Sequence, residues 1–296
     1  LTTALNLYLT GKADWIYDPP PPALRELLKE EPPRNDINPK PLLMTYYYLL
    51  NTTRKPLDDV RVRRALSLAL DRQEITERIL AAGEIPARSV VPQGMPNYTR
   101  QECAPRDPDR ARQLLAEAGY PNGRGFPSID ILYNTHEAHQ MIAEVVRKQW
   151  LRELNINVKG RNEEWGSYLS STHQLQYFVA RRGWSADYPD PDTFLNMFVT
   201  DGEENNTGWG NPKYDALIQA AGEEPDAQRR REKLQAAERL LMDEMPIIPF
   251  FFYVSKDLVK PHVRGFYNNP LMYHPVWSIA IDREGKTPNP FLKGRP

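Results

Sequence analysis

Residues 177–192 read YFVARRGWSADYPDPD, and this stretch decides the fold class. Its first four residues, 177–180, form an apolar run that is typical of a buried strand. A turn rich in proline and aspartate follows, in which Asp190 and Pro191 carry the signature of a helix start. A buried strand that leads into a helix is the unit from which α/β proteins are built.

The same alternation of strands and helices extends over residues 58–254. Further apolar strand patterns are found at 44–50, 129–133 and 247–254. Helix starts are indicated by capping side chains at Asp58 or Asp59, Asp107, Asn211 and Asp226. The sequence therefore predicts an α/β layered domain over this range. Before it, four consecutive prolines (19–22) predict an extended connector.

Composition excludes several classes of protein. The 296 residues carry 38 Lys and Arg against 39 Asp and Glu, a net charge of −1, whereas nucleic-acid binders need a basic face. The single cysteine, Cys103, cannot form an intramolecular disulfide. The apolar run 247–254 is far shorter than the ~20 residues that span a bilayer. Because residue 1 is Leu and no signal-like segment follows it, we expect a chain cut from a longer one.

Asp187 is the strongest candidate for a functional residue. It follows the buried strand and stands beside Trp184 and Tyr188, a setting that suits capture of an ammonium group; a structural cap or surface ion pair is the alternative. Arg181 lies six residues earlier, and in a regular strand it shares one face with Gly183 and Ser185.

A cation and an anion at opposite ends of one strand could hold both ends of a zwitterionic chain, whose backbone would pair with the strand edge. An internal acid as the partner of Arg181 is the alternative.

No catalytic site is predicted. His136 and His139 are three residues apart and could offer two imidazoles to a metal, but the spacing is not that of a zinc protease helix, so we expect solvated or ligand-facing histidines. Ser185 lacks the glycine pattern of a nucleophile elbow, and nothing near Cys103 would activate its thiol.

Several segments together carry a resemblance to a known family. They are KPLDDVRVRRALSLALDR (55–72), DPDRARQLLAEAGY (107–120), GWSADYPDPDTFLNMF (183–198) and VKPHVRGF (259–266). The chain resembles the extracytoplasmic peptide-binding proteins of ABC importers, the oligopeptide- and dipeptide-binding members of the periplasmic binding protein superfamily. The resemblance implies a two-lobed, clamshell α/β fold that encloses a peptide and delivers it to a membrane permease.

The resemblance also implies roles for individual residues. Asp187 would bind the α-amino group of the peptide, and Gly183 to Ser185 would pair with its backbone. Trp184 and Trp165 would line side-chain pockets, and Arg181 and His139 would meet the ligand's carboxylate. Thr172 stands where well-studied members carry another arginine. We expect wide, hydrated pockets that tolerate many side chains, because ordered water can replace direct contacts.

The resemblance covers only the C-terminal part of such proteins. It implies a second lobe at residues 56–254 and an incomplete first lobe made of residues 1–55 and 255–296. We therefore expect a monomeric, periplasmic or otherwise extracytoplasmic solute-binding protein that is no enzyme and needs no cofactor, metal or nucleic acid. The alternatives are a relative that binds a glycan, nickel chelate or opine, and a metal-dependent hydrolase that uses His136 and His139.

Overall fold

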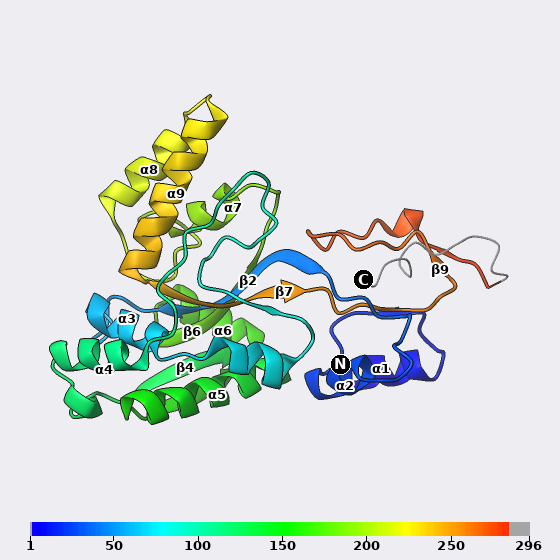
Figure 1. Cartoon of the computed structure of the whole chain (residues 1–296), viewed down its shortest axis with the longest axis horizontal. Coiled ribbons are helices and arrows are strands. Elements are labelled where there is room, and N and C mark those ends of the chain that lie inside the picture. The colour runs from blue at the N-terminus through cyan, green and yellow to red at the C-terminus, as the bar shows by residue number, and fades with distance from the viewer. Residues whose placement is uncertain (1, 284–296) are drawn as a thin grey trace.

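The computed structural model describes residues 2–283, which form a larger and a smaller part (Figure 1). The larger part is built around a six-stranded sheet and holds the main hydrophobic core. The smaller part gathers residues from near both ends of the chain around two small cores. Strands β2 (Pro41–Leu50) and β7 (Ile247–Val254) run between the two parts, so the chain crosses this boundary twice.

The sheet has the strand order β3-β7-β2-β6-β4-β5. Its other strands are β3 (Ile85–Pro86), β4 (Ile129–Asn134), β5 (Val158–Glu163) and β6 (Val179–Ser185). β2 is antiparallel to both β6 and β7, whereas β4 is parallel to both β5 and β6. The parallel half is connected through α5 (Glu137–Leu154) and α6 (Trp165–His173), as parallel strands require. The expected α/β layering is confirmed.

The helices of the larger part include four that begin directly after the predicted caps Asp59, Asp107, Asn211 and Asp226, whereas the helix predicted from Asp190 and Pro191 begins at Asp192. Besides α5 and α6 they are α3 (Val60–Leu68), α4 (Pro108–Glu117), α7 (Asp192–Leu195), α8 (Pro212–Gly222), α9 (Ala227–Glu244), the π-helix η1 (Glu74–Leu80) and the short 3₁₀ helices η2 (Pro121–Gly123) and η3 (Asn196–Phe198). The side chains of Asp59, Asp107, Asn211 and Asp226 each accept a backbone N–H of the first turn. Such caps satisfy donors that a helix leaves unpaired.

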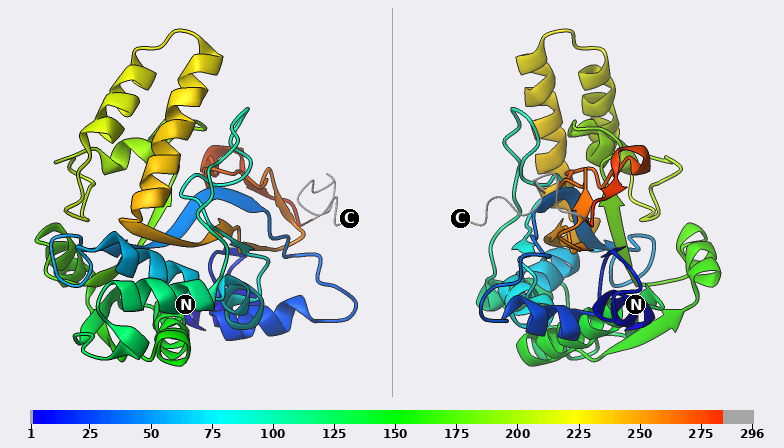
Figure 2. Two further views of the ribbon diagram at one scale, coloured as in Figure 1. Left: turned by 60° about the vertical axis from the view of Figure 1, so that its left-hand side comes forward. Right: turned by 90° about the vertical axis from the view of Figure 1, so that its right-hand side faces the viewer.

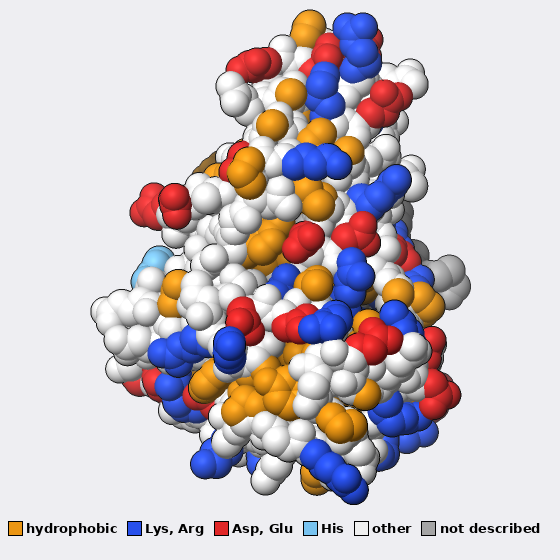
Figure 3. Space-filling model, turned by 90° about the vertical axis from the view of Figure 1, so that its left-hand side faces the viewer, with side chains coloured by type: hydrophobic (Ala, Val, Ile, Leu, Met, Phe, Trp, Pro, Cys, Tyr) orange, Lys and Arg blue, Asp and Glu red, His pale blue; other side chains and the backbone are white. Residues whose placement is uncertain are grey.

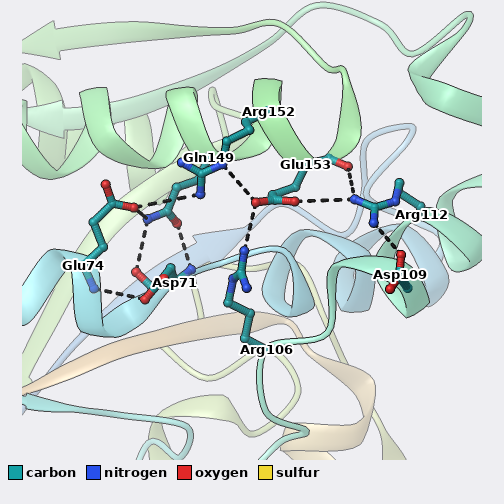
Figure 4. A network of polar contacts seen from close by, with 8 residues as sticks. All are labelled: Asp71, Glu74, Arg106, Asp109, Arg112, Gln149, Arg152 and Glu153. Atoms are coloured by element: carbon teal, nitrogen blue, oxygen red, sulfur yellow. Dashed lines mark hydrogen bonds and ion pairs between the residues drawn. The ribbon is translucent and has the colours of Figure 1, made fainter.

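A polar network holds α5 against its neighbours (Figure 4). The Glu153 carboxylate lies 2.9 Å from both Arg106 and Arg152 and 3.4 Å from Arg112. Burial opposes ionisation of Glu153, but Arg152 and Arg106 prevail and lower its pKa. One turn earlier, the Gln149 side chain bonds to the backbone N–H and C=O of Asp71. The network therefore fixes α5 relative to the segments that precede α4 and η1.

Helices α8 and α9 form a hairpin that stands away from the sheet (Figures 1 and 2). Its base is joined to the loop 87–103 by one buried carboxylate, Glu238. This carboxylate accepts bonds from the N–H groups of Val91 and Gln101 and from the Tyr98 hydroxyl. Burial raises the pKa of Glu238 to about 7, although the three donors favour its charged form.

The smaller part is assembled from short elements. They are α1 (Thr2–Leu9), β1 (Trp15–Ile16), α2 (Pro21–Leu28), β8 (Leu258–Val259), β9 (Val263–Arg264), the 3₁₀ helix η4 (Val276–Ser278) and β10 (Ala280–Ile281). β1 pairs with β8 and β9 with β10, so the beginning and the end of the described chain share this part. Asp36 accepts a 2.7 Å bond from the Tyr8 hydroxyl, which fastens α1 to the loop before β2.

Three features differ from the expectations. The prolines at 19–22 do not form an extended connector throughout, because Pro21 begins α2, and proline suits the first turn of a helix. The buried strand predicted at 177–180 continues as β6 to Ser185. β2, which falls within the range 1–55 expected for the first lobe, lies at the centre of the large sheet because β6 and β7 flank it. Residues 284–296 of the range 255–296 lie outside the described residues.

The surface agrees with the near-zero net charge. On the face drawn in Figure 3, basic and acidic side chains are interspersed and do not gather into a field of one sign. Within residues 2–283, no helix combines the length and the apolar character needed to cross a membrane.

Candidate functional site

The second half of β6 has an edge that no other strand of residues 2–283 covers. On one side, β2 pairs with β6 from Val179 to Ser185. On the other side, β4 pairs only with Val179 and Ala180, and then continues beside β5 alone. Residues 181–185 therefore present what we call the open edge.

The main-chain groups of Gly183 and Ser185 face the open edge. The N–H of Ala186 donates a 2.8 Å bond to the carbonyl of Leu43 in β2. In an antiparallel pair, hydrogen-bonded and non-hydrogen-bonded residues alternate. The main chain of residues 182 and 184 therefore bonds to β2, and that of residues 181, 183 and 185 points the other way. Because the Tyr168 hydroxyl donates to the Arg181 carbonyl, Gly183 and Ser185 remain to pair with an added strand.

The Arg181 side chain stands at one end of the open edge among neutral partners. Its Nη1 donates to Asn134 Oδ1 at 3.2 Å and its Nη2 to the Tyr253 hydroxyl at 3.3 Å. Its guanidinium carbon lies 5.3 Å from the centre of the Tyr46 ring, and its enclosed Nε has no acceptor among residues 2–283. No carboxylate of the described chain forms an ion pair with it, so an internal acidic partner is not found there.

Arg181 borders a hollow of about 290 Å³, which we call the Arg181 pocket. Most of its exposed wall is apolar, and its polar side chains come from β6, from the start of α5, from the segment after β7 and from the segment after β1. The wall residues are Tyr17, Asp18, Leu42, Met44, Tyr46, Leu80, Asn134, His136, Ala138, His139, Ile142, Arg181, Phe251, Tyr253, Val254, Ser255, Lys256, Asp257 and Met272. They come from the larger part, the smaller part and the segment after β7, so the pocket lies where the two parts meet.

The other charged groups of the Arg181 pocket already have partners. Lys256 lies 2.8 Å from the buried Glu84 and 3.8 Å from Asp18. His136 Nε2 lies 3.4 Å from Asp18. Burial opposes ionisation of Asp18, but these two neighbours prevail and lower its pKa. Arg181 is therefore the cation of this pocket for which the described residues supply no anion.

His139 is buried and neutral. Burial, followed by the positive charges of Arg181, His136 and Lys256, lowers the pKa of His139 far below its usual range. Its Nδ1 has no hydrogen-bond partner among the described residues. A neutral imidazole keeps one N–H donor, and His139 is among the residues that line the pocket.

Asp187 lies beyond the other end of the open edge, in a second hollow of about 290 Å³ that we call the Asp187 pocket. The residues that line it are Trp184, Asp187, Tyr188, Thr193, Asn196, Met197, Val199, Gly202, Glu203 and Glu204. The Asp187 carboxylate accepts a 3.1 Å bond from the Thr193 hydroxyl, and the same hydroxyl accepts the Asp187 N–H at 3.2 Å. The carboxylate is thus oriented by a neutral group, remains exposed, and forms no ion pair within the described chain.

Trp165 lies beside this site without lining either pocket. It is 51% exposed and stacks on Tyr168, with ring centres 5.5 Å apart. Because Tyr168 bonds to the Arg181 carbonyl, the indole is held near the start of the open edge.

The histidines do not form a recognisable metal site. Their ring centres are 4.7 Å apart, but His136 Nδ1 accepts the Ala138 N–H and thereby caps α5. Residues 2–283 contain no group of three or more His, Cys, Asp or Glu placed to hold a metal ion. The hydrolase alternative therefore lacks a ligand set in the described chain.

The structure brings the predicted residues together around one strand. Arg181 and His139 share one pocket, Asp187 and Trp184 share the other, and Gly183 and Ser185 lie between the two. Sequence reasoning missed Asn134 and Tyr253, which hold the guanidinium. Asn134 could have been noticed as a polar residue that ends an alternating strand, whereas Tyr253 lies in an apolar run that gives no such signal.

Comparison with known proteins gives consistent matches. Residues 1–206 match the family described as bacterial extracellular solute-binding proteins, family 5 Middle. The chain is 37% identical over 271 residues to the periplasmic oligopeptide-binding protein OppA of Salmonella typhimurium, covering 89% of this chain and 49% of that protein. It is 35% identical to the periplasmic murein peptide-binding protein MppA of Escherichia coli, covering 91% and 51%. The chain thus spans about half the length of the curated relatives it matches.

Solved structures show the same fold. A periplasmic oligopeptide-binding protein from Borrelia burgdorferi superposes with a TM-score of 0.87 at 36% identity, covering 95% of this chain and 56% of that one. OppA of Haemophilus influenzae, solved in complex with the peptide RPPGFSPFR, superposes with a TM-score of 0.87 at 32% identity over the same shares. The resemblance stated from the sequence, and the two-lobed α/β fold that it implies, are confirmed.

Proposed function

The chain belongs to the bacterial extracellular solute-binding proteins of family 5, and we propose that it is part of a protein that captures oligopeptides and passes them to an ABC permease. The observation that carries this proposal is the open edge of β6 with a cation at one end and a carboxylate at the other. An extended peptide matches these three features, because it has a main chain that can pair with the edge, a positive charge at its amino end and a negative charge at its carboxyl end.

The positions of the two charges give the ligand a direction. With its amine at Asp187 and its carboxylate at Arg181, the peptide runs antiparallel to β6. Gly183 and Ser185 can then each exchange main-chain bonds with it. Six residues of strand span about 20 Å, so an extended ligand that reaches both charges has at most about six residues. Trp184, and Trp165 beside the edge, would supply apolar contact for its side chains.

Asp187 is suited to bind the α-amino group because nothing in the described chain neutralises it. Its hydrogen bond from Thr193 fixes the carboxylate without cancelling its charge. Charge-assisted hydrogen bonds are about twice as strong as neutral ones. At the other end, Arg181 and the neutral imidazole of His139 together can donate to both oxygens of a carboxylate.

The larger part would form one lobe, and the smaller part would belong to the other. The proposed action is capture and release without a covalent step, by a monomer outside the cytoplasm. Support comes from the relatives, which are named as binding proteins. Some of them are named for other ligands, such as the probable deoxycholate-binding protein YgiS of Escherichia coli at 33% identity, so the test includes non-peptide solutes.

Calorimetry on the longer protein, with Ala-based peptides of three to six residues, tests the proposal. We expect Asp187→Ala to weaken binding of peptides with a free amine by about 10- to 150-fold, since a hydrogen bond to a charged group contributes about 1.5–3 kcal/mol. N-acetylated peptides should bind both proteins equally weakly. Unchanged affinity in Asp187→Ala would remove the amine-binding role. Binding of a glycan, nickel chelate or opine, but no peptide, would replace the proposed ligand class.

A further inference from the structure

We propose that the Arg181 pocket selects peptides whose last residue has a large apolar side chain and a free carboxylate. This inference rests on the proposed function and narrows its substrate class. It departs from the expectation of wide, hydrated pockets that tolerate any side chain, and the reason lies in what surrounds Arg181.

The wall of the pocket is built mainly from carbon. Leu42 and Met44 come from β2, Phe251 from β7, Ile142 from α5, and Met272 from the C-terminal segment. Ile142, Leu42 and Phe251 are buried, so these walls are fixed by the core. Water in such a hollow finds few polar partners, and an apolar group that replaces it gains the free energy of burial.

Several polar atoms of the residues that line the pocket lack a hydrogen-bond partner among the described residues. Arg181 has only neutral partners, and its Nε, the His139 Nδ1 and the Tyr46 hydroxyl have none among the described residues. The two acids of the wall are engaged elsewhere. Asp18 contacts His136 and Lys256, and Asp257 accepts a 2.8 Å bond from the Trp15 indole N–H. The pocket therefore joins an unpaired cation to an apolar wall.

The size of the pocket fits one side chain. A dry cavity of about 150 Å³ is enough to hold benzene, so about 290 Å³ accommodates one large apolar side chain with its carboxylate. A charged or hydroxyl-bearing side chain that lies against Leu42, Met44 and Ile142 would lose its water, and these three side chains offer it no hydrogen bond in return.

The experiment compares pairs of peptides that differ in their last residue. Ala-based peptides of four to six residues, ending in Leu or Ser and prepared as free acids and as amides, are titrated into the chain while its NMR spectrum is recorded. Ratios of affinity are compared, so weak absolute binding does not matter. We expect the Leu acid to bind about 10- to 100-fold more tightly than the Ser acid, as burial of a leucine side chain predicts.

Two variants and a control tie the preference to this pocket. Met44→Ser and Met272→Ser each remove one apolar wall and should reduce the Leu-to-Ser ratio to a few-fold. Met272 is 45% exposed, so its replacement leaves the core intact if Met44→Ser disturbs folding. Leu151→Ser, at a 51% exposed position of α5 that does not line the pocket, should leave the ratio unchanged.

The outcomes separate this inference from the proposed function. Equal affinity for Leu and Ser acids, with amides binding more weakly, would overturn the apolar selection and leave peptide capture standing. A Leu preference that Met44→Ser and Met272→Ser do not reduce would place the selection elsewhere and overturn it too. Peptide binding that depends on neither terminus would overturn both.

Discussion

Replacing Arg181 by glutamine tests the proposed recognition of a peptide's carboxyl end by this side chain. Glutamine keeps a hydrogen-bonding side chain near Asn134 and Tyr253 but removes the positive charge. If the positive charge of Arg181 binds the ligand's carboxylate, its loss should weaken binding only when the ligand carries a carboxylate. The perturbation is therefore made on both molecules, Arg181→Gln in the protein and acid to amide in the peptide.

The magnitude follows from the surroundings of the guanidinium. Its partners within the chain are neutral, and its Nε is enclosed, so a carboxylate would meet it with little competition from water. Hydrogen bonds to charged groups contribute about 1.5–3 kcal/mol, which corresponds to a roughly 10- to 150-fold change in affinity. We expect wild-type protein to prefer acid over amide by this factor and Arg181→Gln to show almost no preference.

The effect on folding should be small. Removal of the cation breaks two charge-assisted hydrogen bonds to neutral acceptors, and it also relieves the opposing cost of enclosing a charge without a counter-ion. We expect the free energy of unfolding, measured with urea, to change by less than about 1 kcal/mol. A loss of affinity in a variant of unchanged stability then reports on binding alone.

Arg182→Gln is the matched control. Arg182 neighbours Arg181 on β6 but is paired with Glu204 at 2.6 Å, so its charge is already compensated. Its replacement should leave the preference for acid over amide intact. The reasoning is refuted if Arg181→Gln weakens acid and amide equally, or if both glutamine variants abolish the preference.

Two further predictions concern the open edge and the α8–α9 hairpin. A Cβ on Gly183 would lie 3.3 Å from the Tyr253 hydroxyl and 3.4 Å from Arg181 Nη2, so Gly183→Ala should displace the guanidinium and weaken the binding of peptides with a free carboxylate about two- to tenfold. A Cβ on Gly160 in β5 would make only ordinary contacts, so Gly160→Ala is the control, and equal effects of the two variants would contradict the prediction. Glu238 has its pKa raised from 4.5 to about 7, so its stabilising contribution is complete below pH 4.5 and lost as pH rises through 7. Urea unfolding should therefore show that, between pH 5 and pH 8, the free energy of unfolding of the wild-type protein falls by up to about 3 kcal/mol more than that of Glu238→Gln. Equal falls in the two proteins would show that Glu238 is not the cause.

Local features of the fold could be predicted because local chemistry determines them. The caps Asp107, Asn211 and Asp226 mark helix starts in the structure, since a side chain that accepts a first-turn N–H acts within its own few residues. β6 was recognised from its apolar start, and the positions of Arg181 and Asp187 beside it followed from strand spacing.

Long-range pairing could not be predicted in the same way. β2 was recognised as a strand, but its place at the centre of the sheet depends on partners more than 125 residues away in sequence, which no local pattern specifies. The Arg181 pocket shows the same limit, because Asp18, Asn134, Tyr253 and Met272 meet there from four distant segments. Sequence reasoning therefore found the charges of the site but not the apolar wall that surrounds one of them.

The unpaired state of Arg181 gains meaning from how this chain treats its other buried charges. Arg63, almost fully buried, donates to the carbonyls of Leu57, Asp58, Glu244 and Met245. Lys256 lies against Glu84. Enclosing a charge without compensation costs several kcal/mol, and Arg181 differs from these two groups because it has two neutral acceptors and no carboxylate partner among the described residues. Under the proposed function, a ligand carboxylate at Arg181 would supply the missing charge, and the ligand's main chain would then lie along the open edge toward Asp187.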